Sequence, residues 1–279
     1  MFADMHVHSQ YSDGTLSFQD IVEKAKAHNI SLLSICDHNI IDVYLKEDDL
    51  CAKAGIKLIA GVEIQSKLDG AEYHVLGYGF DVHNKRLNQM LEYNQGVLAD
   101  MGTELIKSMA KDYPSLSVEE FSTYERDRKN GGWSSIDYLK SKGLAQGWFG
   151  YLKHARKYAT EPTRSFPHPV DVIKAIHDAG GYVVVAHLGD SLNQDGQRCK
   201  KMASQFLDMG ADGFECYYPS HGADITLFLL DFCREHDLLI TAGSDDHGGF
   251  NTVDGGCVYD MATHKVMARQ LELKGLLRP

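Results

Sequence analysis

Two short pairs of potential metal ligands lie near opposite ends of the chain. His6 and His8 are two residues apart in an apolar segment, and Asp245 and His247 repeat this spacing. Alternate residues of a strand point to the same side, so each pair can present two ligand atoms to one ion. Imidazole combined with carboxylate suits Zn²⁺, Mn²⁺ or Fe²⁺ better than Ca²⁺ or Mg²⁺, which prefer oxygen ligands. The spacing therefore indicates a site for transition-metal ions.

Other Asp, Glu and His residues follow the remaining apolar segments of the chain. Six such segments end in residues of this kind, namely His6 with His8, Asp37 with His38, Glu63, His187, Glu215, and Asp245 with His247. In parallel α/β barrels the carboxyl ends of the strands converge on one face, where catalytic groups gather. We therefore expect these side chains to share one site. So many buried titratable groups need charged partners, which favours bound ions over a purely structural role.

The segments between these residues predict the elements that would position them. Apolar strands alternate with amphipathic helices up to about residue 80 and again after residue 163. The patterns predict strands over 2–6, 32–36, 57–62, 182–186, 212–215 and 238–242, and helices over 18–27, 42–54, 170–178, 200–209 and 223–236. Two extended segments around residues 69–70 complete the first stretch. Such alternation predicts a mainly parallel α/β architecture.

The middle of the chain has a different character. Between residues 84 and 162 the strand signals vanish, and helical or polar segments replace them. We therefore expect a small helical cap domain, residues 84–162, inserted into an α/β domain formed by residues 1–83 and 163–279.

Length, composition and charge limit the class of protein. With 279 residues and 43% hydrophobic content the chain can bury a large core. The net charge of −11 argues against broad electrostatic binding of a nucleic-acid duplex. We therefore expect a small substrate rather than a nucleic-acid polymer. A small phosphorylated substrate is compatible with this negative net charge, because bound metal cations make the electrostatic potential positive at their site. No apolar run approaches the roughly 20 residues of a membrane helix, and no secretory signal is evident, so we expect a cytoplasmic protein.

Five motifs resemble those of a known family. They are M-H-V-H-S-x-x-S-D-G at residues 5–14, C-D-H at 36–38, G-V-E at 61–63, V-A-H at 185–187 and G-S-D-D-H at 243–247. In order and in strand context they look like the PHP family, named after polymerase and histidinol phosphatase. The resemblance implies a distorted (β/α)₇ barrel that holds two or three divalent metal ions (Zn, Mn or Fe).

The resemblance also implies how nine ligands divide among three ions. The first ion would be held by His6, His8, Glu63 and Asp245. Glu63 would bridge to a second ion held by His74 and His187, and a third would be held by Asp13, His38 and His247.

The helical insertion narrows the resemblance to one branch of the family. Together with G-F-E-C-Y-Y-P-S-H at residues 213–221, it looks like the branch of small-molecule phosphoesterases. That branch includes nucleoside 3′,5′-bisphosphate phosphatases and cyclic-phosphate hydrolases. This sequence departs from it where Arg-Pro-His is expected before a cap helix, because residues 133–136 read Trp-Ser-Ser-Ile. The usual Ala-His-Pro is also replaced, by Ala-His-Leu at residues 186–188.

These observations predict hydrolysis of a small phosphorylated metabolite, either a phosphomonoester or a cyclic phosphodiester. A hydroxide that bridges two ions would attack phosphorus. Glu63 suits the bridging position because a carboxylate offers two oxygens. Asp13 and His221 are the other catalytic candidates, with His221 as leaving-group acid or substrate contact. Arg164 and Lys153 are further candidates for binding a substrate phosphate.

Three alternatives remain open. An amidohydrolase-type enzyme that cleaves C–N bonds also uses H-x-H in a barrel, and a non-catalytic module would only bind metal. A nuclease acting on RNA 5′ ends is the third, because a 5′-terminal nucleotide resembles a nucleoside phosphate. The oligomeric state is not predicted.

Overall fold

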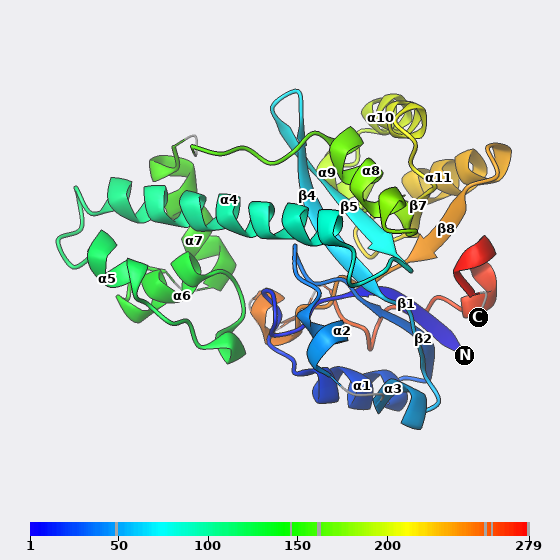
Figure 1. Cartoon of the computed structure of the whole chain (residues 1–279), viewed down its shortest axis with the longest axis horizontal. Coiled ribbons are helices and arrows are strands. Elements are labelled where there is room, and N and C mark those ends of the chain that lie inside the picture. Colours follow the sequence, from blue (N-terminus) through cyan, green and yellow to red (C-terminus); the bar gives the residue numbers. More distant parts are fainter. Residues whose placement is uncertain (48–49, 146, 161–162, 254–255, 258, 278–279) are drawn as a thin grey trace.

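The computed structural model describes residues 1–47, 50–145, 147–160, 163–253, 256–257 and 259–277 (Figure 1). The chain forms a mixed α/β body from which a group of helices projects to one side, as Figure 1 shows. Within the described residues, no helix combines the length and the apolar character that crossing a membrane requires.

Two sheets form the centre of the body. One sheet contains β1 (Phe2–Val7), β2 (Ile30–Ile35) and β3 (Lys57–Leu58), in that order. The other contains β4 (Gly61–Leu68), β5 (Ala71–Tyr78), β6 (Tyr182–Val185), β7 (Gly213–Tyr217) and β8 (Leu239–Ala242), also in chain order. A separate short pair consists of β9 (Thr252–Val253) and β10 (Gly256–Cys257).

The prediction of a mainly parallel sheet is wrong around β5. β1 to β3 and β6 to β8 are parallel, but β5 runs antiparallel to both β4 and β6. The reason is the turn at Asp69 and Gly70, whose φ angles of 50° and 84° close a two-residue hairpin between β4 and β5. The predicted strand 57–62 is also divided, because β3 ends at Leu58 and β4 begins at Gly61.

The two sheets meet at both edges. A parallel bridge joins Val7 to Asp246 on one side, and a second joins His38 to Glu63 on the other. These single bridges bring the ends of β1, β2, β4 and β8 together. The closed (β/α)₇ barrel stays a prediction, because the contacts between the sheets are bridges rather than continuous ladders.

Helices cover the outer faces of both sheets. α1 (Phe18–Ala27) begins at a capping box formed by Ser17 and Asp20, and it buries Ile21 and Val22 against β2. The predicted helix 42–54 is observed as α2 (Asp42–Lys46) and α3 (Leu50–Lys53), and residues 48–49 lie outside the described part. The larger sheet is covered by α8 (Pro169–Asp178), α10 (Gly196–Asp208) and α11 (Ala223–Glu235), with the short α9 (Leu188–Ser191) after β6.

A hydrophobic cluster between the sheets fixes their spacing. It contains residues from both sheets, including Met5 of β1, Leu76 and Tyr78 of β5, and Leu239 of β8. The Tyr78 hydroxyl donates a hydrogen bond of 2.8 Å to the carbonyl oxygen of Met5. The strand ends that carry the predicted ligands therefore rest on a well-packed interior.

The projecting helices are α4 (Lys85–Met109), α5 (Val118–Ser122), α6 (Ser134–Ser141) and α7 (Gly147–Tyr158), and we refer to them as the cap helices. α4 begins in the body, where Leu87 and Leu91 belong to the main core. Its last turns belong to a separate cluster, in which Ile106 and Met109 pack with Tyr138. That residues 84–162 form a domain of their own stays a prediction.

Candidate metal centre

The predicted ligands lie together beyond the ends of the strands. His6 and His8 have no exposed surface, and Glu63 is 1% exposed. The side chain of Asp245 is 14% exposed and that of His74 23%, so these two lie nearer the opening. The nine residues come from six separate segments of the chain. They are His6, His8, Asp13, His38, Glu63, His74, His187, Asp245 and His247.

The first predicted group is compact. The Nε2 atoms of His6 and His8 lie 3.2 Å from the same oxygen of Glu63. The Oδ1 atom of Asp245 lies 3.5 Å from His6 Nε2 and 3.0 Å from His8 Nε2. The four side chains offer ligand atoms close enough together to hold one ion.

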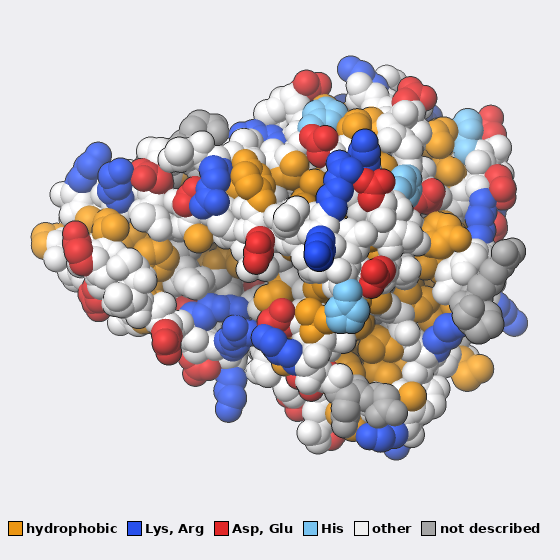
Figure 2. Space-filling model, viewed as in Figure 1, with side chains coloured by type: hydrophobic (Ala, Val, Ile, Leu, Met, Phe, Trp, Pro, Cys, Tyr) orange, Lys and Arg blue, Asp and Glu red, His pale blue; other side chains and the backbone are white. Residues whose placement is uncertain are grey.

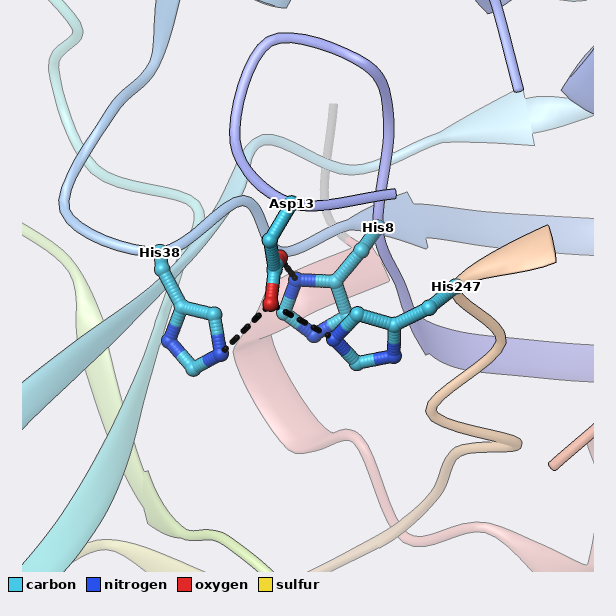
Figure 3. A group of neighbouring side chains, drawn as sticks. All are labelled: His8, Asp13, His38 and His247. Carbon is cyan, nitrogen blue, oxygen red and sulfur yellow. Dashed lines mark ion pairs between the residues drawn. The ribbon is translucent and has the colours of Figure 1, made fainter. Parts of the chain in front are cut away.

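A second compact group surrounds Asp13. Figure 3 shows the imidazoles of His8, His38 and His247 around its carboxylate. Asp13 Oδ2 lies 3.2 Å from His247 Nε2 and 3.8 Å from His38 Nε2, and Asp13 Oδ1 lies 3.4 Å from His8 Nδ1. The structure thus brings together the residues predicted for the third ion and adds His8 as a neighbour.

Glu63 connects these groups. Its Oε1 atom lies 2.8 Å from His74 Nδ1 and 2.9 Å from His187 Nε2. Its Oε2 atom contacts His6 and His8, and it lies 3.3 Å from His38 Nδ1. The two oxygens of one carboxylate therefore face different sets of imidazoles, as a bridging ligand requires.

Further side chains contact the predicted ligands. Glu215, which is fully buried, lies 3.0 Å from His6 Nδ1 and accepts a 3.0 Å hydrogen bond from the backbone N–H of His187. This contact leaves Nε2 of His6 directed at the cluster. The Tyr218 hydroxyl donates a 2.8 Å hydrogen bond to Asp245 Oδ2. Sequence reasoning did not select Tyr218, although it directly follows β7 and so shares the position that identified the other residues.

The backbone is strained at two predicted ligands. His187 has a φ angle of 27° and Asp245 one of 56°, in the left-handed region that costs roughly 1–2 kcal/mol for a residue with a Cβ atom. Gly243, just before Asp245, allows the close approach of β8 and β1. A Cβ atom there would lie 2.2 Å from the Cβ of His6 and 2.3 Å from a carboxylate oxygen of Glu215. Residues with such strained backbone angles often lie at functional sites, and here both side chains are predicted ligands.

The donor set fits divalent transition-metal ions. Within the described part of the chain, His8 Nδ1, His38 Nδ1 and Asp245 Oδ1 are buried polar atoms with no hydrogen-bond partner. Buried polar atoms ordinarily find partners, and an ion would supply one for atoms of this kind. Six imidazoles and three carboxylates form a mixed nitrogen and oxygen set, which suits zinc, manganese or iron.

The electrostatics of the cluster link metal binding to protons. Burial lowers the pKa of His6, but the carboxylates of Glu63 and Glu215 outweigh it and hold that pKa well above its ordinary value. Burial likewise opposes ionisation of His74, yet the Glu63 carboxylate raises its pKa to about 10. His38 differs, because burial lowers its pKa to about 3 in spite of Glu63 and Asp13. Without ions, the carboxylates therefore favour the protonated form of His6 and His74, whereas His38 stays neutral.

We expect metal binding to release protons and to strengthen as the pH rises. A raised pKa means that His6 and His74 carry protons below that pKa, and an imidazole must lose a proton to become a ligand. Titration calorimetry of the metal-free protein with Zn²⁺ at pH 7, in two buffers of different ionisation enthalpy, should give different heats. Equal heats in both buffers would contradict this assignment of charge.

Two of the three remaining predicted site residues have other contacts. Nδ1 of His221 lies 3.3 Å from the carbonyl oxygen of Cys216, and its Nε2 accepts a 3.1 Å hydrogen bond from the N–H of Gly189. The Nε–H of Arg164 donates a 2.7 Å hydrogen bond to the carboxylate of Asp100, a residue of α4. Lys153 is exposed on α7. The catalytic role of His221 and the phosphate-binding roles of Arg164 and Lys153 stay predictions.

A loop of the cap segment contacts the centre. The N–H of Gly132 donates a 2.7 Å hydrogen bond to the carbonyl oxygen of Asp13. The Arg126 guanidinium donates to the carbonyl oxygens of Ser12 and Gly132. Sequence reasoning missed Arg126, because nothing in its local pattern indicates which loop it joins.

Basic side chains lie near this loop. Lys46 Nζ and the guanidinium carbon of Arg128 lie 5.6 Å and 5.8 Å from the centre of the Tyr11 ring. Figure 2 shows several Lys and Arg side chains gathered where the cap helices meet the lower part of the body. Lys46 also pairs with the Asp42 carboxylate, and the Tyr11 hydroxyl donates to Glu47.

Comparison with known proteins gives a consistent result. The model of the PHP domain family matches residues 4–164, which is more than half of the chain. A 5′-3′ exoribonuclease of Haemophilus influenzae is 28% identical over 256 residues, covering 88% of this chain and 89% of that protein. A 3′,5′-nucleoside bisphosphate phosphatase of Chromobacterium violaceum is 26% identical over 293 residues, covering 99% of this chain and 98% of that protein.

A solved structure shares the fold. It comes from a Bifidobacterium adolescentis protein assigned as a metal-dependent phosphoesterase, and its TM-score is 0.76. The match covers 95% of this chain and 92% of that one, at 23% sequence identity. At this identity the likeness concerns the fold alone.

Proposed function

Because this chain belongs to the PHP domain family, we propose that it is a metal-dependent phosphoesterase that hydrolyses a small phosphorylated metabolite. One observation carries the proposal, namely the single buried carboxylate of Glu63, which lies within 3.3 Å of imidazole nitrogens from five histidines. A carboxylate in this position suits a centre with more than one ion.

Each side chain has a proposed place in the centre. His6, His8, Glu63 and Asp245 would hold one ion, and Asp13, His38 and His247 another. Glu63 would reach a further ion together with His74 and His187. When bound, divalent ions would lower the pKa of a coordinated water and neutralise the charge on phosphoryl oxygens.

The rest of the chain would orient these ligands. Glu215 fixes the ring of His6 and the backbone of His187 at the same time, and Tyr218 fixes one oxygen of Asp245. Such contacts keep ligand atoms from rotating away and favour one tautomer of His6. The burial of His6, His8 and Glu63 keeps bulk water from competing for the ligand atoms.

A nuclease acting on RNA 5′ ends is the second candidate. The exoribonuclease of Haemophilus influenzae is a relative over most of the chain. The basic residues Lys46 and Arg128 beside the Tyr11 ring would also suit the backbone of a single strand, in which bases stack on aromatic rings and phosphates face cations.

The decisive experiment measures phosphate release by the metal-loaded protein. The panel should contain nucleoside monophosphates and bisphosphates, cyclic phosphates, sugar phosphates, histidinol phosphate and 5′-phosphorylated oligoribonucleotides. We expect turnover of a small ester to exceed that of the oligonucleotide. Preferential release of mononucleotides from the oligonucleotide would favour the second candidate. Cleavage of dihydropyrimidines, with no activity on any phosphate ester, would overturn both.

A further inference from the structure

A partly buried lysine of α1 forms ion pairs with two carboxylates from the C-terminal part of the chain. Lys24 Nζ donates a 2.5 Å hydrogen bond to Asp246 Oδ2 and lies 2.8 Å from Asp260 Oδ1. The side chain of Lys24 is 23% exposed, and that of Asp246 is 1% exposed. The pair therefore ties a helix near the start of the chain to the segment that carries the last two predicted ligands.

Asp246 lies directly between two predicted ligands, Asp245 and His247. Its carbonyl oxygen accepts a 2.9 Å hydrogen bond from the backbone N–H of a third, His8. The parallel bridge to Val7 lies at the same place, where β1 meets the segment after β8. A shift of Asp246 would therefore move the ligands on both sides of it and would loosen the backbone of His8.

Three donors hold the Asp246 carboxylate. Its Oδ1 atom accepts a 2.7 Å hydrogen bond from the N–H of Gly248, and its Oδ2 atom accepts from the N–H of Met261 at 3.0 Å and from Lys24. Lys24 is the charged donor among them, and a buried carboxylate is strongly destabilised when the cation that it pairs with is removed. Without this cation, the carboxylate would gain by turning toward water, and residue 246 would carry its neighbours with it.

The strained backbone at Asp245 makes this contact important. Its φ angle of 56° is of a kind that persists only where surrounding contacts fix it. The pair formed by Lys24 is such a contact, and it comes from a firmly packed helix. Ile21, Val22 and Ala25 of α1 are all buried.

We propose that Lys24 is a positioning residue of the metal centre. Through its ion pair with Asp246, it holds the two flanking ligands, Asp245 and His247, where they bind ions. The inference rests on the proposed function, because it takes these two residues as ligands. They belong to different groups of candidate ligands, so loss of Lys24 weakens the binding of more than one ion.

The first test measures metal binding without any substrate. Lys24→Met keeps an unbranched apolar side chain but removes the charge. In titrations of the chelator-treated protein with Zn²⁺, the concentration at half-saturation should be about tenfold higher for Lys24→Met than for the native chain. Lys24→Arg keeps the positive charge and should restore most of the affinity. An unchanged half-saturation in Lys24→Met would overturn the proposal.

The matched control is Lys26→Met, which makes the same chemical change at an exposed position of the same helix. It should bind Zn²⁺ as the native chain does. A loss of affinity in this control equal to that in Lys24→Met would show that any lost charge of α1 has the effect, and the specific role of Lys24 would be refuted.

A double-mutant cycle tests whether Lys24 acts through Asp246. In a chain that carries Asp246→Asn the ion pair is already absent, so adding Lys24→Met should raise the half-saturating Zn²⁺ concentration by less than about twofold. A further rise of about tenfold would mean that Lys24 acts by another route, which contradicts the proposal. If Lys24→Met does not fold, Asp246→Asn alone supplies the test, because it should raise the half-saturating concentration by about tenfold.

The melting temperature of the metal-free protein distinguishes positioning from a general contribution to stability. If Lys24→Met lowers this temperature but leaves the half-saturating Zn²⁺ concentration unchanged, Lys24 only stabilises α1 and the inference fails.

These measurements also separate this inference from the proposed function. If no phosphate ester is hydrolysed but Lys24→Met binds Zn²⁺ more weakly, the phosphoesterase proposal fails and the positioning role of Lys24 stands. If esters are hydrolysed and the Zn²⁺ affinity of Lys24→Met is unchanged, only the positioning role fails.

Discussion

Glu63→Gln is expected to lower kcat/KM for phosphate ester hydrolysis by about a thousandfold, equivalent to about 4 kcal/mol of transition-state free energy. Glutamine keeps the shape of the side chain but removes its charge and replaces one acceptor oxygen with an NH₂ donor. That donor would face imidazole nitrogens that now lie 2.8–3.3 Å from the carboxylate. Metal content, measured by mass spectrometry of the dialysed protein, should fall as well.

The matched control is Glu104→Gln, which makes the same chemical change at a partly exposed position of α4, where the carboxylate pairs with Lys107 at 3.1 Å. It should leave both activity and metal content unchanged. If Glu63→Gln retained full metal content and lost less than tenfold in kcat/KM, Glu63 would not connect the ions as proposed.

Removal of the metal ions is expected to abolish hydrolysis and to lower the melting temperature by about 10 °C. Ions present at about 1,000 times their dissociation constant stabilise the folded state by about 4 kcal/mol, and each kcal/mol shifts the melting temperature of a domain of this size by about 2–4 °C. The loss has a structural cause, because His8 Nδ1 and Asp245 Oδ1 are buried atoms without a hydrogen-bond partner, and removal of an ion would leave them so.

Calorimetric scans with and without a chelator, followed by separate addition of Zn²⁺, Mn²⁺ and Fe²⁺, would measure the effect. The ion that restores both the melting temperature and activity is the best candidate for the native cofactor. In Glu63→Gln the shift caused by the chelator should be smaller, since fewer ions are bound at the start. An unchanged melting temperature in the native chain would show that ions contribute little to the fold.

The strand-end residues that the structure brings together could be predicted from the sequence, because their selection depends on local patterns. A polar residue that follows an apolar strand can be read directly from the sequence, and parallel strand ends meet at one edge. That rule selected Glu63, His187 and Asp245 from segments far apart in the chain. The rule did not reach Tyr218, because the predicted strand ends at Glu215 whereas β7 runs to Tyr217.

The direction of β5 was harder to predict from the sequence, because it depends on the turn that precedes the strand. Apolar alternation is the same for a parallel and an antiparallel strand, and only the two residues Asp69 and Gly70 decide that the chain reverses there. His74 lies on this reversed strand, which explains why no strand-end pattern pointed to it. Its place beside Glu63 follows from the antiparallel register instead.

The contact between the cap segment and the centre could not be predicted at all. Arg126 and Gly132 lie in a stretch whose sequence indicates only a loop before a helix. Their roles depend on which surface the loop meets, and that is decided by the packing of helices distant in sequence. Tertiary contacts of this kind leave no periodic signal in the chain.

The single helix α4 has a mechanical consequence. Its 25 residues form a rod of about 37 Å that is anchored at one end in the body and at the other among the cap helices. A swinging lid needs a pliable joint, but an unbroken helix resists bending along its whole length. If the outer helices move relative to the body, α4 should therefore carry them as one piece, and the shorter loop that joins Gly132 to Asp13 should adjust more readily than the helix.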